Sequence, residues 1–301
     1  MADLSVNIAG VQFKNPVLTA SGTFGSGREY NNFIDLNRLG GIVVKGVSHK
    51  PWSGNKPPRI AETHGGMLNS IGLQNFGAKA FIATDMPFLR NIDTKVIVNL
   101  CGHTIEEYVA VAKDFEGVEG VDLFELNISC PNIDKGGMAF GTDPALVERV
   151  VSAVKACVKV PLIVKLSPNV TDIVSIAKAA EAGGADALSL INTLMGMKID
   201  IYKRKPVLAN TIGGLSGPAI KPVALRMVYQ TAKKVSIPII GMGGIMTGDD
   251  AIEFIMAGAA AVAVGTANFV KPTATVDILE GIEAFMEAQN IRDISDIRGI
   301  I

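Results

Sequence analysis

Polar residues recur at one kind of place in this sequence, at or directly after short apolar runs with the composition of buried strands. The first five are Ser21, Lys45, Asn99, Asn127 and Lys165. A buried lysine needs an anionic or electron-rich partner, because desolvating an ammonium group is costly. Asparagine side chains both donate and accept hydrogen bonds, which suits a ligand with amide-like edges. The pattern therefore predicts a site for a polar ligand that bears negative charge.

The later apolar runs are followed by Asn192-Thr193, Gly243-Gly244 and Gly265-Thr266. Glycine turns let backbone N–H groups approach an anion, and phosphate commonly binds at such turns in α/β barrels. No GxGxxG follows the first run, and the sequence contains no GxxxxGK[ST]. We therefore expect a mononucleotide with one phosphate and not a dinucleotide, and FMN fits that description.

Cys130 follows Asn127-Ile128-Ser129 at the opening of a long loop, and an accessible thiolate can accept a proton. It is the candidate catalytic base. Cys101 and Cys157 are expected to be structural thiols, the latter on a helix that faces the core. An odd number of cysteines without CxxC spacing argues against a disulfide framework or a zinc or iron–sulfur site on this chain, and it favours a cytoplasmic setting.

Bulk properties exclude several function classes. The chain has 28 basic and 29 acidic residues, so charge gives no reason to expect nucleic acid or an anionic membrane as a partner. The longest small-apolar stretch, 257–264, is much shorter than the roughly 20 residues of a membrane helix. No signal peptide is expected. His49, His64 and His103 lack metal-ligand spacing, so no metal site is predicted, and His64 is expected on a surface loop.

The elements that must position these residues are eight short strands. We expect them at 17–20, 41–44, 96–99, 123–128, 162–166, 187–191, 239–241 and 261–264. Nearly continuous apolar composition indicates parallel strands buried on both faces, and helix-period segments separate them. The prediction is one α/β domain over residues 1–301, a (β/α)8 TIM barrel whose strand ends meet at one face. An open doubly wound sheet is the rival fold.

Helices are predicted over 105–115, 145–158, 171–183, 250–256 and 274–288, and Thr104, Asp143 and Thr247 are cap candidates. An N-terminal β-hairpin at 4–13 should lie across the barrel bottom. Two long irregular βα loops, 48–75 and 133–142, are expected over the C-terminal face, where loops of this length usually bind ligands or act as lids. Trp52 and Met67 are expected to pack within the first loop.

Several motifs together resemble the class 1 dihydroorotate dehydrogenases. They are Lys45-Gly46, NSIGLQN (69–75), NISCPN (127–132), KLSPN (165–169), Asn192-Thr193, GGLSGPAIKP (213–222) and the two glycine turns. The resemblance extends from about residue 7 to about residue 287, and NSIGLQN and NISCPN are highly specific together.

The resemblance implies that the chain oxidises dihydroorotate to orotate in pyrimidine biosynthesis. Cys130 matches the base that removes the C5 proton, and the hydride from C6 passes to N5 of FMN. Lys45 and Lys165 are also implied as catalytic residues, with Lys165 beside the N1/O2 edge of the flavin, where it stabilises the reduced anion. The implied substrate contacts are Lys45, Asn69, Ser70, Ile71, Gly72, Leu73, Asn127, Asn192 and Thr193.

The implied FMN contacts are Ser21, Lys45, Gly46, Asn99, Asn127, Lys165, Ile191, Gly217, Gly243, Gly244, Gly265 and Thr266. Residues 132–137, residues 140–144 and Gln74 resemble the NAD-linked class 1B. That class works with a second subunit carrying FAD and a 2Fe–2S cluster, in a heterotetramer of two catalytic and two electron-transfer subunits. The alternatives are a fumarate-linked class 1A homodimer, another FMN barrel acting on pyrimidines, and a non-enzymatic scaffold.

Overall fold

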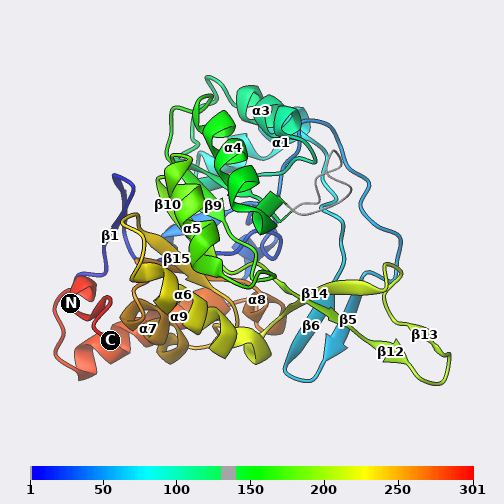
Figure 1. Cartoon of the computed structure of the whole chain (residues 1–301). Coiled ribbons are helices and arrows are strands. Elements are labelled where there is room, and N and C mark those ends of the chain that lie inside the picture. Colours follow the sequence, from blue (N-terminus) through cyan, green and yellow to red (C-terminus); the bar gives the residue numbers. More distant parts are fainter. Residues whose placement is uncertain (1, 130–139) are drawn as a thin grey trace.

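A computed structural model describes residues 2–129 and 140–301. Eight parallel strands close into a barrel and follow one another around it in chain order (Figure 1). They are β3 (Val17–Thr19), β4 (Gly41–Val43), β7 (Lys95–Leu100), β8 (Leu123–Asn127), β9 (Leu162–Lys165), β10 (Ala187–Leu190), β15 (Ile239–Met242) and β16 (Ala261–Val264). Each predicted strand differs from its observed counterpart by at most one residue at either end. The (β/α)8 prediction is confirmed, and closure of the sheet excludes the open doubly wound rival.

Helices cover the outside of the barrel because one face of each is apolar. They are α1 (Ala78–Thr84), α2 (Met86–Leu89), α3 (Ile105–Asp114), α4 (Pro144–Lys155), α5 (Ile173–Ala182), α6 (Lys221–Ala232), α7 (Gly248–Met256), α8 (Ala267–Val270) and α9 (Ala274–Ala288). After β3, short 3₁₀ turns at Tyr30–Asn32 and Leu36–Arg38 take the place of a first long helix. The helix predicted over 274–288 has those bounds.

Helix starts are fixed by side-chain caps at the predicted residues. The Thr104 hydroxyl accepts from the backbone N–H of Glu107, while the Glu107 carboxylate accepts from the N–H of His103, one residue earlier than a capping box requires. Asp143 caps α4, and a full capping box opens α7 at Thr247. The helix predicted from 171 begins at Ile173, because Asp172 is the residue that caps it.

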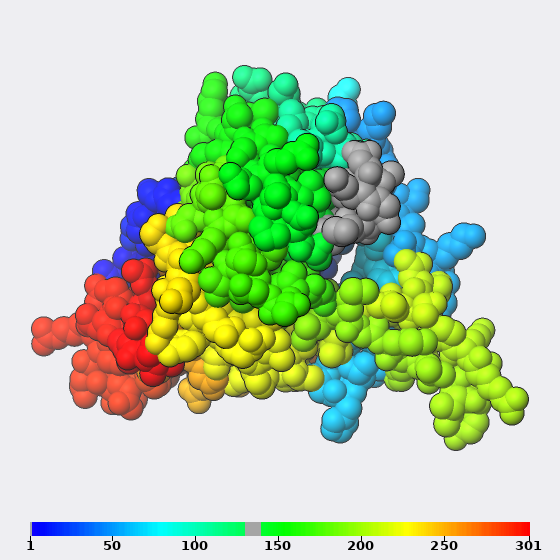
Figure 2. Space-filling model, in the orientation of Figure 1, coloured from blue at the N-terminus to red at the C-terminus, as the bar shows by residue number. Residues whose placement is uncertain are grey.

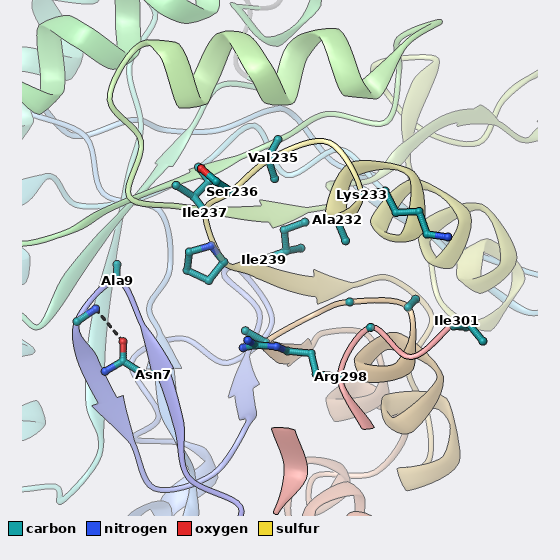
Figure 3. Close-up of a pocket in the computed structure, with 16 residues that line it drawn as sticks. Asn7, Ala9, Ala232, Lys233, Val235, Ser236, Ile237, Ile239, Arg298 and Ile301 are labelled. Carbon is teal, nitrogen blue, oxygen red and sulfur yellow. Dashed lines mark hydrogen bonds between the residues drawn. The ribbon is translucent and has the colours of Figure 1, made fainter. Parts of the chain in front are cut away.

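The N-terminal hairpin is confirmed at the barrel bottom. Strands β1 (Val6–Ile8) and β2 (Val11–Phe13) pair antiparallel through a turn at Ala9-Gly10. This turn lines a cavity of about 550 Å³ with the start of β15 and the C-terminal segment (Figure 3). Because the start of β15 is the N-terminal end of a barrel strand, the cavity lies opposite the face where the predicted site residues gather.

A four-stranded antiparallel sheet over the barrel mouth was not predicted. Its order is β11 (Leu194–Met197), β14 (Ile212–Ser216), β6 (Gly66–Asn69) and β5 (Ile60–Thr63). Strands β12 (Ile199–Asp200) and β13 (Lys205–Pro206) form a hairpin that stands out from the body of the molecule (Figure 2). The expectation of an irregular loop at 48–75 was therefore wrong, since part of it pairs with a segment more than 100 residues later.

Cys101 and Cys157 lie in different environments. Cys101 is fully buried, as expected, but Cys157 lies beyond the end of α4 and is only partly buried, so its placement on a core-facing helix was wrong. Within 2–129 and 140–301, no helix is long and apolar enough to cross a membrane. The same residues include no cluster of three or more His, Cys, Asp or Glu side chains that could hold a metal ion.

Candidate active site

Four neighbouring strands place polar side chains in the barrel interior. Parallel pairing sets Asn99 of β7 beside Glu125 of β8, Asn127 beside Lys165 of β9, and Lys165 beside Ser189 of β10. Alternate residues of a strand point to the same face, so Glu125 and Asn127 both face inward. Sequence reasoning predicted three members of this row and missed Glu125 and Ser189.

The Glu125 carboxylate lies at the centre of this row. Its Oε1 accepts a 2.6 Å hydrogen bond from Nδ2 of Asn99, and its Oε2 accepts a 2.7 Å bond from the Ser189 hydroxyl. The Nζ of Lys165 lies 3.8 Å from Oε1. Asn99 and Glu125 are each about 1% exposed and Lys165 is 6% exposed. A charged pair this deep persists only when both members are partnered, as they are here.

Lys45 lies at the end of β4, close to this network. Its backbone N–H donates to the carbonyl of Gly25. A side chain at Gly22 would begin 3.8 Å from the Lys45 Nζ. Desolvation lowers the pKa of Lys45, the positive charges of Lys165 and Arg59 lower it further, and Cys101 opposes this shift. The neighbouring Gly46 must lack a side chain, since a Cβ there would lie 2.6 Å from the Cys101 sulfur.

Asn127 and Asn192 meet at the ends of β8 and β10. The Asn192 Nδ2 donates to Ser129 Oγ at 2.9 Å and lies 3.3 Å from Asn127 Oδ1. The Tyr108 hydroxyl donates to the Asn127 carbonyl and holds this end of β8 from the helix side. Two predicted substrate contacts from strands 65 residues apart are therefore joined directly.

The predicted substrate loop, residues 69–73, leaves the sheet over the barrel mouth. Asn69 ends β6 and its Nδ2 donates to the carbonyl of Gly214 in β14. The Ser70 hydroxyl is buried and has no hydrogen-bond partner among the described residues. A buried hydroxyl without a partner is costly, so this oxygen is well suited to a polar ligand.

The rest of this loop includes a tight backbone conformation that requires glycine at position 72. Gly72 has φ 72° and packs on Asn55, so close that a Cβ would lie 2.7 Å from it. Ile71 accepts from the Asn55 N–H, and Leu73 also has positive φ. The Leu73 side chain lies near Gly46, and the loop therefore reaches the Lys45 segment.

Thr193 connects the barrel to the sheet above it. Its hydroxyl lies against Gly214, where a Cβ would be only 2.0 Å from the threonine oxygen. Its carbonyl accepts from Asn169, whose own side chain also accepts from the Met195 N–H. Because Gly214 also bonds Asn69, the two predicted substrate segments around 69 and 193 are in contact through β14.

The predicted phosphate turns also converge. Gly217, Gly243 and Gly244 all have φ between 79° and 125°, a region that favours glycine. A Cβ at Gly243 would lie 3.4 Å from Ile191 Cγ1, so that predicted contact belongs to the same place. Gly265 differs, because its φ is ordinary and a Cβ would make only van der Waals contacts, with Ala20 at 3.4 Å and Thr23 at 3.8 Å.

Backbone donors are available at these turns. Within the described part of the chain, the N–H groups of Gly244, Gly265 and Thr266 donate no hydrogen bond. The Thr266 hydroxyl donates to Ser216 at 2.7 Å, which joins the end of β16 to the residue before Gly217. Unpaired N–H groups on glycine turns at strand ends fit a phosphate group.

The remaining predicted residues are placed as follows. Ser21 follows β3 at the same face, partly exposed. Cys130 and residues 133–139 of the predicted loop lie outside the described residues. His64 is exposed at the β5–β6 turn, as expected for a surface histidine. Trp52 pairs with Asn75 of its own loop, and its ring stacks on His103, outside that loop, with ring centroids 4.1 Å apart.

The missed residues left only a faint signal in the sequence. Glu125 is the one acidic residue inside an otherwise apolar strand, two positions before Asn127. Such spacing places both side chains on one face of a strand. An acid in a buried strand demands a partner, but the partners come from three other strands and share no motif with it. Ser189 is a single serine in an apolar run.

Comparison with known proteins gives consistent matches along the chain. Residues 3–286 match the family model described as Dihydroorotate dehydrogenase. The chain is 67% identical to the protein named "Dihydroorotate dehydrogenase B (NAD(+)), catalytic subunit" of Alkaliphilus metalliredigens, over 99% of this chain and 98% of the relative. It is 63% identical to the protein of that name from Lachnoclostridium phytofermentans, over 99% of each. A crystal structure of DHODH from Eimeria tenella in complex with ferulenol is similar in fold, with TM-score 0.81 at 23% identity, covering 99% of this chain and 88% of that one.

Proposed function

The chain belongs to the dihydroorotate dehydrogenase family, and from that premise we propose that it oxidises (S)-dihydroorotate to orotate with FMN as bound cofactor. The observation that supports this most is the presence of two half-sites at the same face of the barrel. One half has amide and ammonium groups around Asn127 and Lys165, and the other has glycine turns around Gly244 and Thr266. A ring with a phosphate tail matches both halves.

The phosphate of FMN would lie on the N–H groups of Gly244, Gly265 and Thr266, and the ring near Lys45, Asn99 and Lys165. The other proposed cofactor contacts are Ser21, Gly46, Asn127, Ile191, Gly217 and Gly243. When bound, FMN would supply the acceptor for the hydride that leaves C6 of dihydroorotate. The protein orients the flavin ring and the substrate and supplies charged groups beside them.

The substrate contacts divide by chemistry. The Lys45 ammonium attracts the carboxylate of dihydroorotate, and desolvation of this site strengthens that attraction. Asn69, Asn127 and Asn192 offer donors and acceptors to the amide-like ring. The Ser70 hydroxyl, which has no hydrogen-bond partner among the described residues, would form a hydrogen bond with the substrate. The remaining proposed substrate contacts are backbone groups of Ile71, Gly72 and Leu73, together with Thr193.

Cys130 is proposed as the base. Loss of the C5 proton builds negative charge on that carbon, so an acceptor must lie within hydrogen-bond reach. Cys130 follows Ser129, whose hydroxyl accepts from Asn192, and the chain therefore enters this segment beside the proposed ring contacts. Thiolate character, which depends on nearby positive charge, makes the cysteine a competent acceptor.

NAD is the proposed final acceptor, reached through a second subunit. Relatives 63–67% identical to this chain are named NAD(+)-linked catalytic subunits, and Gln74 accepts from Arg59 beside the substrate loop. We propose that the partner carries FAD and a 2Fe–2S cluster, in an assembly of two catalytic and two electron-transfer subunits. A partner is needed because this sequence has no dinucleotide fingerprint.

The test is to purify the chain with and without the candidate electron-transfer subunit and to identify the bound flavin. We expect FMN on this chain in both cases. Dihydroorotate should reduce NAD only in the complex, while fumarate should not serve as oxidant for the chain alone. Rapid fumarate-linked turnover by the isolated chain would favour the class 1A alternative. A chain that holds no flavin would contradict the proposal.

A further inference from the structure

Glu125 is a buried carboxylate that the reaction as described does not use. It contacts Asn99, Ser189 and Lys165, two of which are proposed flavin contacts. We propose that Glu125 is a positioning residue that holds Asn99 and Lys165 toward the flavin site and lowers the midpoint potential of the bound flavin. This inference rests on the proposed function, since it concerns the potential of the FMN that this site would hold.

The cost of burying this carboxylate points to a role beyond stability. Two ionised groups in a barrel interior lose much of their hydration, and a well-packed apolar pair is often as stable or more so. The other residues of β8 before Asn127 are apolar, so a fourth apolar residue at position 125 would continue the pattern. Position 125 instead carries a glutamate, and the residues that it contacts lie at the mouth of the barrel.

The contacts of Glu125 fix the orientation of Asn99. Because Nδ2 of Asn99 donates to Glu125, its Oδ1 points the other way and accepts from the Cys101 thiol at 3.4 Å. That oxygen lies against Gly46, where a Cβ would be 3.0 Å from it. The hydrogen bond from Asn99 to Glu125 thus orients the Asn99 amide so that its oxygen faces the Lys45-Gly46 segment.

The contact with Lys165 is electrostatic and not a tight hydrogen bond. At 3.8 Å the ammonium is close enough to be attracted, and its donors stay available for another acceptor. The negative charge of Glu125 partly offsets the positive charge of Lys165. Reducing a flavin adds negative charge to its ring, so a nearby carboxylate makes reduction less favourable.

The test compares Glu125→Gln with Asp122→Asn in the full-length chain loaded with FMN. Asp122 directly precedes β8, at the opposite end from Asn127, where it accepts from the Val96 N–H and contacts Lys95 at 3.1 Å. Both substitutions replace a lysine-paired carboxylate with its amide, but only one lies at the flavin face. Spectroelectrochemical titration gives the midpoint potential, and equilibrium dialysis gives FMN affinity.

Glu125→Gln should bind reduced FMN more tightly relative to oxidised FMN by about tenfold, which is about 30 mV toward positive potential for a two-electron couple. Asp122→Asn should leave the potential at its wild-type value. An equal potential in all three proteins would overturn the inference. If the wild-type chain holds FMN that dihydroorotate reduces, that result leaves the proposed function intact; a wild-type chain without FMN contradicts both.

Ser189→Ala supplies a second variant that does not depend on Glu125→Gln folding. It removes one donor to the carboxylate without changing any charge, so the carboxylate is less neutralised. The potential should then move slightly in the negative direction, opposite to Glu125→Gln. If both substitutions acted only by loosening the packing of the barrel, they would shift the midpoint potential in the same direction, and that outcome would overturn the inference. Glu125→Asp, which keeps the charge, should stay closer to the wild-type potential than Glu125→Gln.

Discussion

The Thr266 hydroxyl donates a 2.7 Å hydrogen bond to the hydroxyl of Ser216, across 50 residues of sequence. Thr266 follows the eighth barrel strand, and Ser216 ends β14 of the antiparallel sheet over the barrel mouth. The bond therefore joins the two structural units at the place where phosphate is proposed to bind. It explains how a sheet built from distant segments can help to shape a barrel site.

Ser216→Ala should weaken FMN binding by roughly 2- to 10-fold, since a hydrogen bond of this kind contributes about 0.5–1.5 kcal/mol. FMN dissociation constants measured by fluorescence would give the change. Ser152→Ala, which removes a hydroxyl bond to Gly183 between α4 and α5, is the matched control and should leave FMN affinity unchanged. If both variants bind FMN as tightly as wild type, Ser216 does not support the phosphate turns.

Gly244→Ala should destabilise the protein and release FMN. Gly244 has φ 79°, which costs a residue with a side chain about 1–2 kcal/mol, and a Cβ would also lie 2.8 Å from the backbone nitrogen of Lys221. Gly10→Ala is the control, because Gly10 has φ 85° but nothing within 4 Å. Thermal unfolding and flavin content would separate the effects. Gly244→Ala with full flavin content would argue against the phosphate site.

Orotate affinity should fall as pH rises, at values below the ordinary lysine pKa of about 10.4. Desolvation lowers the pKa of Lys45, so its ammonium charge is lost earlier than that of an exposed lysine. Below the lowered pKa the charge is present and attracts the carboxylate; above it the attraction is gone. Binding of orotate favours the charged form and should take up a proton in the transition.

Lys45→Arg separates this effect from other titrations. Arginine stays charged throughout this range, so the variant should bind orotate with a flatter pH profile, even if its affinity is lower because the geometry differs. Isothermal titration in buffers of different ionisation enthalpy measures both affinity and proton uptake. Identical pH profiles for wild type and variant would show that another group controls binding.

Cys130→Ala should keep FMN but slow its reduction by dihydroorotate roughly 100-fold or more, the usual contribution of a positioned base. Cys130→Ser should retain some activity with its optimum at higher pH, because a hydroxyl is a weaker acid than a thiol. Cys157→Ala, at a partly buried position beyond α4, serves as control. Stopped-flow absorbance follows the flavin. Reduction of Cys130→Ala at the wild-type rate would remove Cys130 as the base.

The barrel strands could be predicted closely because their burial on both faces requires apolar residues at nearly every position, and that pattern is visible within each short segment. Strands such as Ala261–Val264 are apolar at every position, which is what burial on both faces requires. The sheet over the mouth could not be predicted in the same way. Gly66–Asn69 and Ile212–Ser216 are short, half-exposed and rich in glycine, and their pairing depends on contacts across more than 100 residues.

Residue type at a strand end was enough to place Lys45, Asn127 and the glycine turns at one face of the barrel, and their roles stay a prediction. Glu125 and Ser189 were missed because their meaning depends on neighbours from other strands. Ser216 was missed for the same reason, since only the fold places it beside Thr266. Cys157 was misplaced because α4 ends at Lys155, before the apolar spacing does.

The most direct measurement is an anaerobic titration of the purified full-length chain with (S)-dihydroorotate, followed by flavin absorbance. The account predicts one FMN per chain, bleached by added dihydroorotate and regenerated when an oxidant is supplied. Bound FMN that stays oxidised under excess dihydroorotate, while chemical reductant bleaches it, would contradict the proposed reaction at this site.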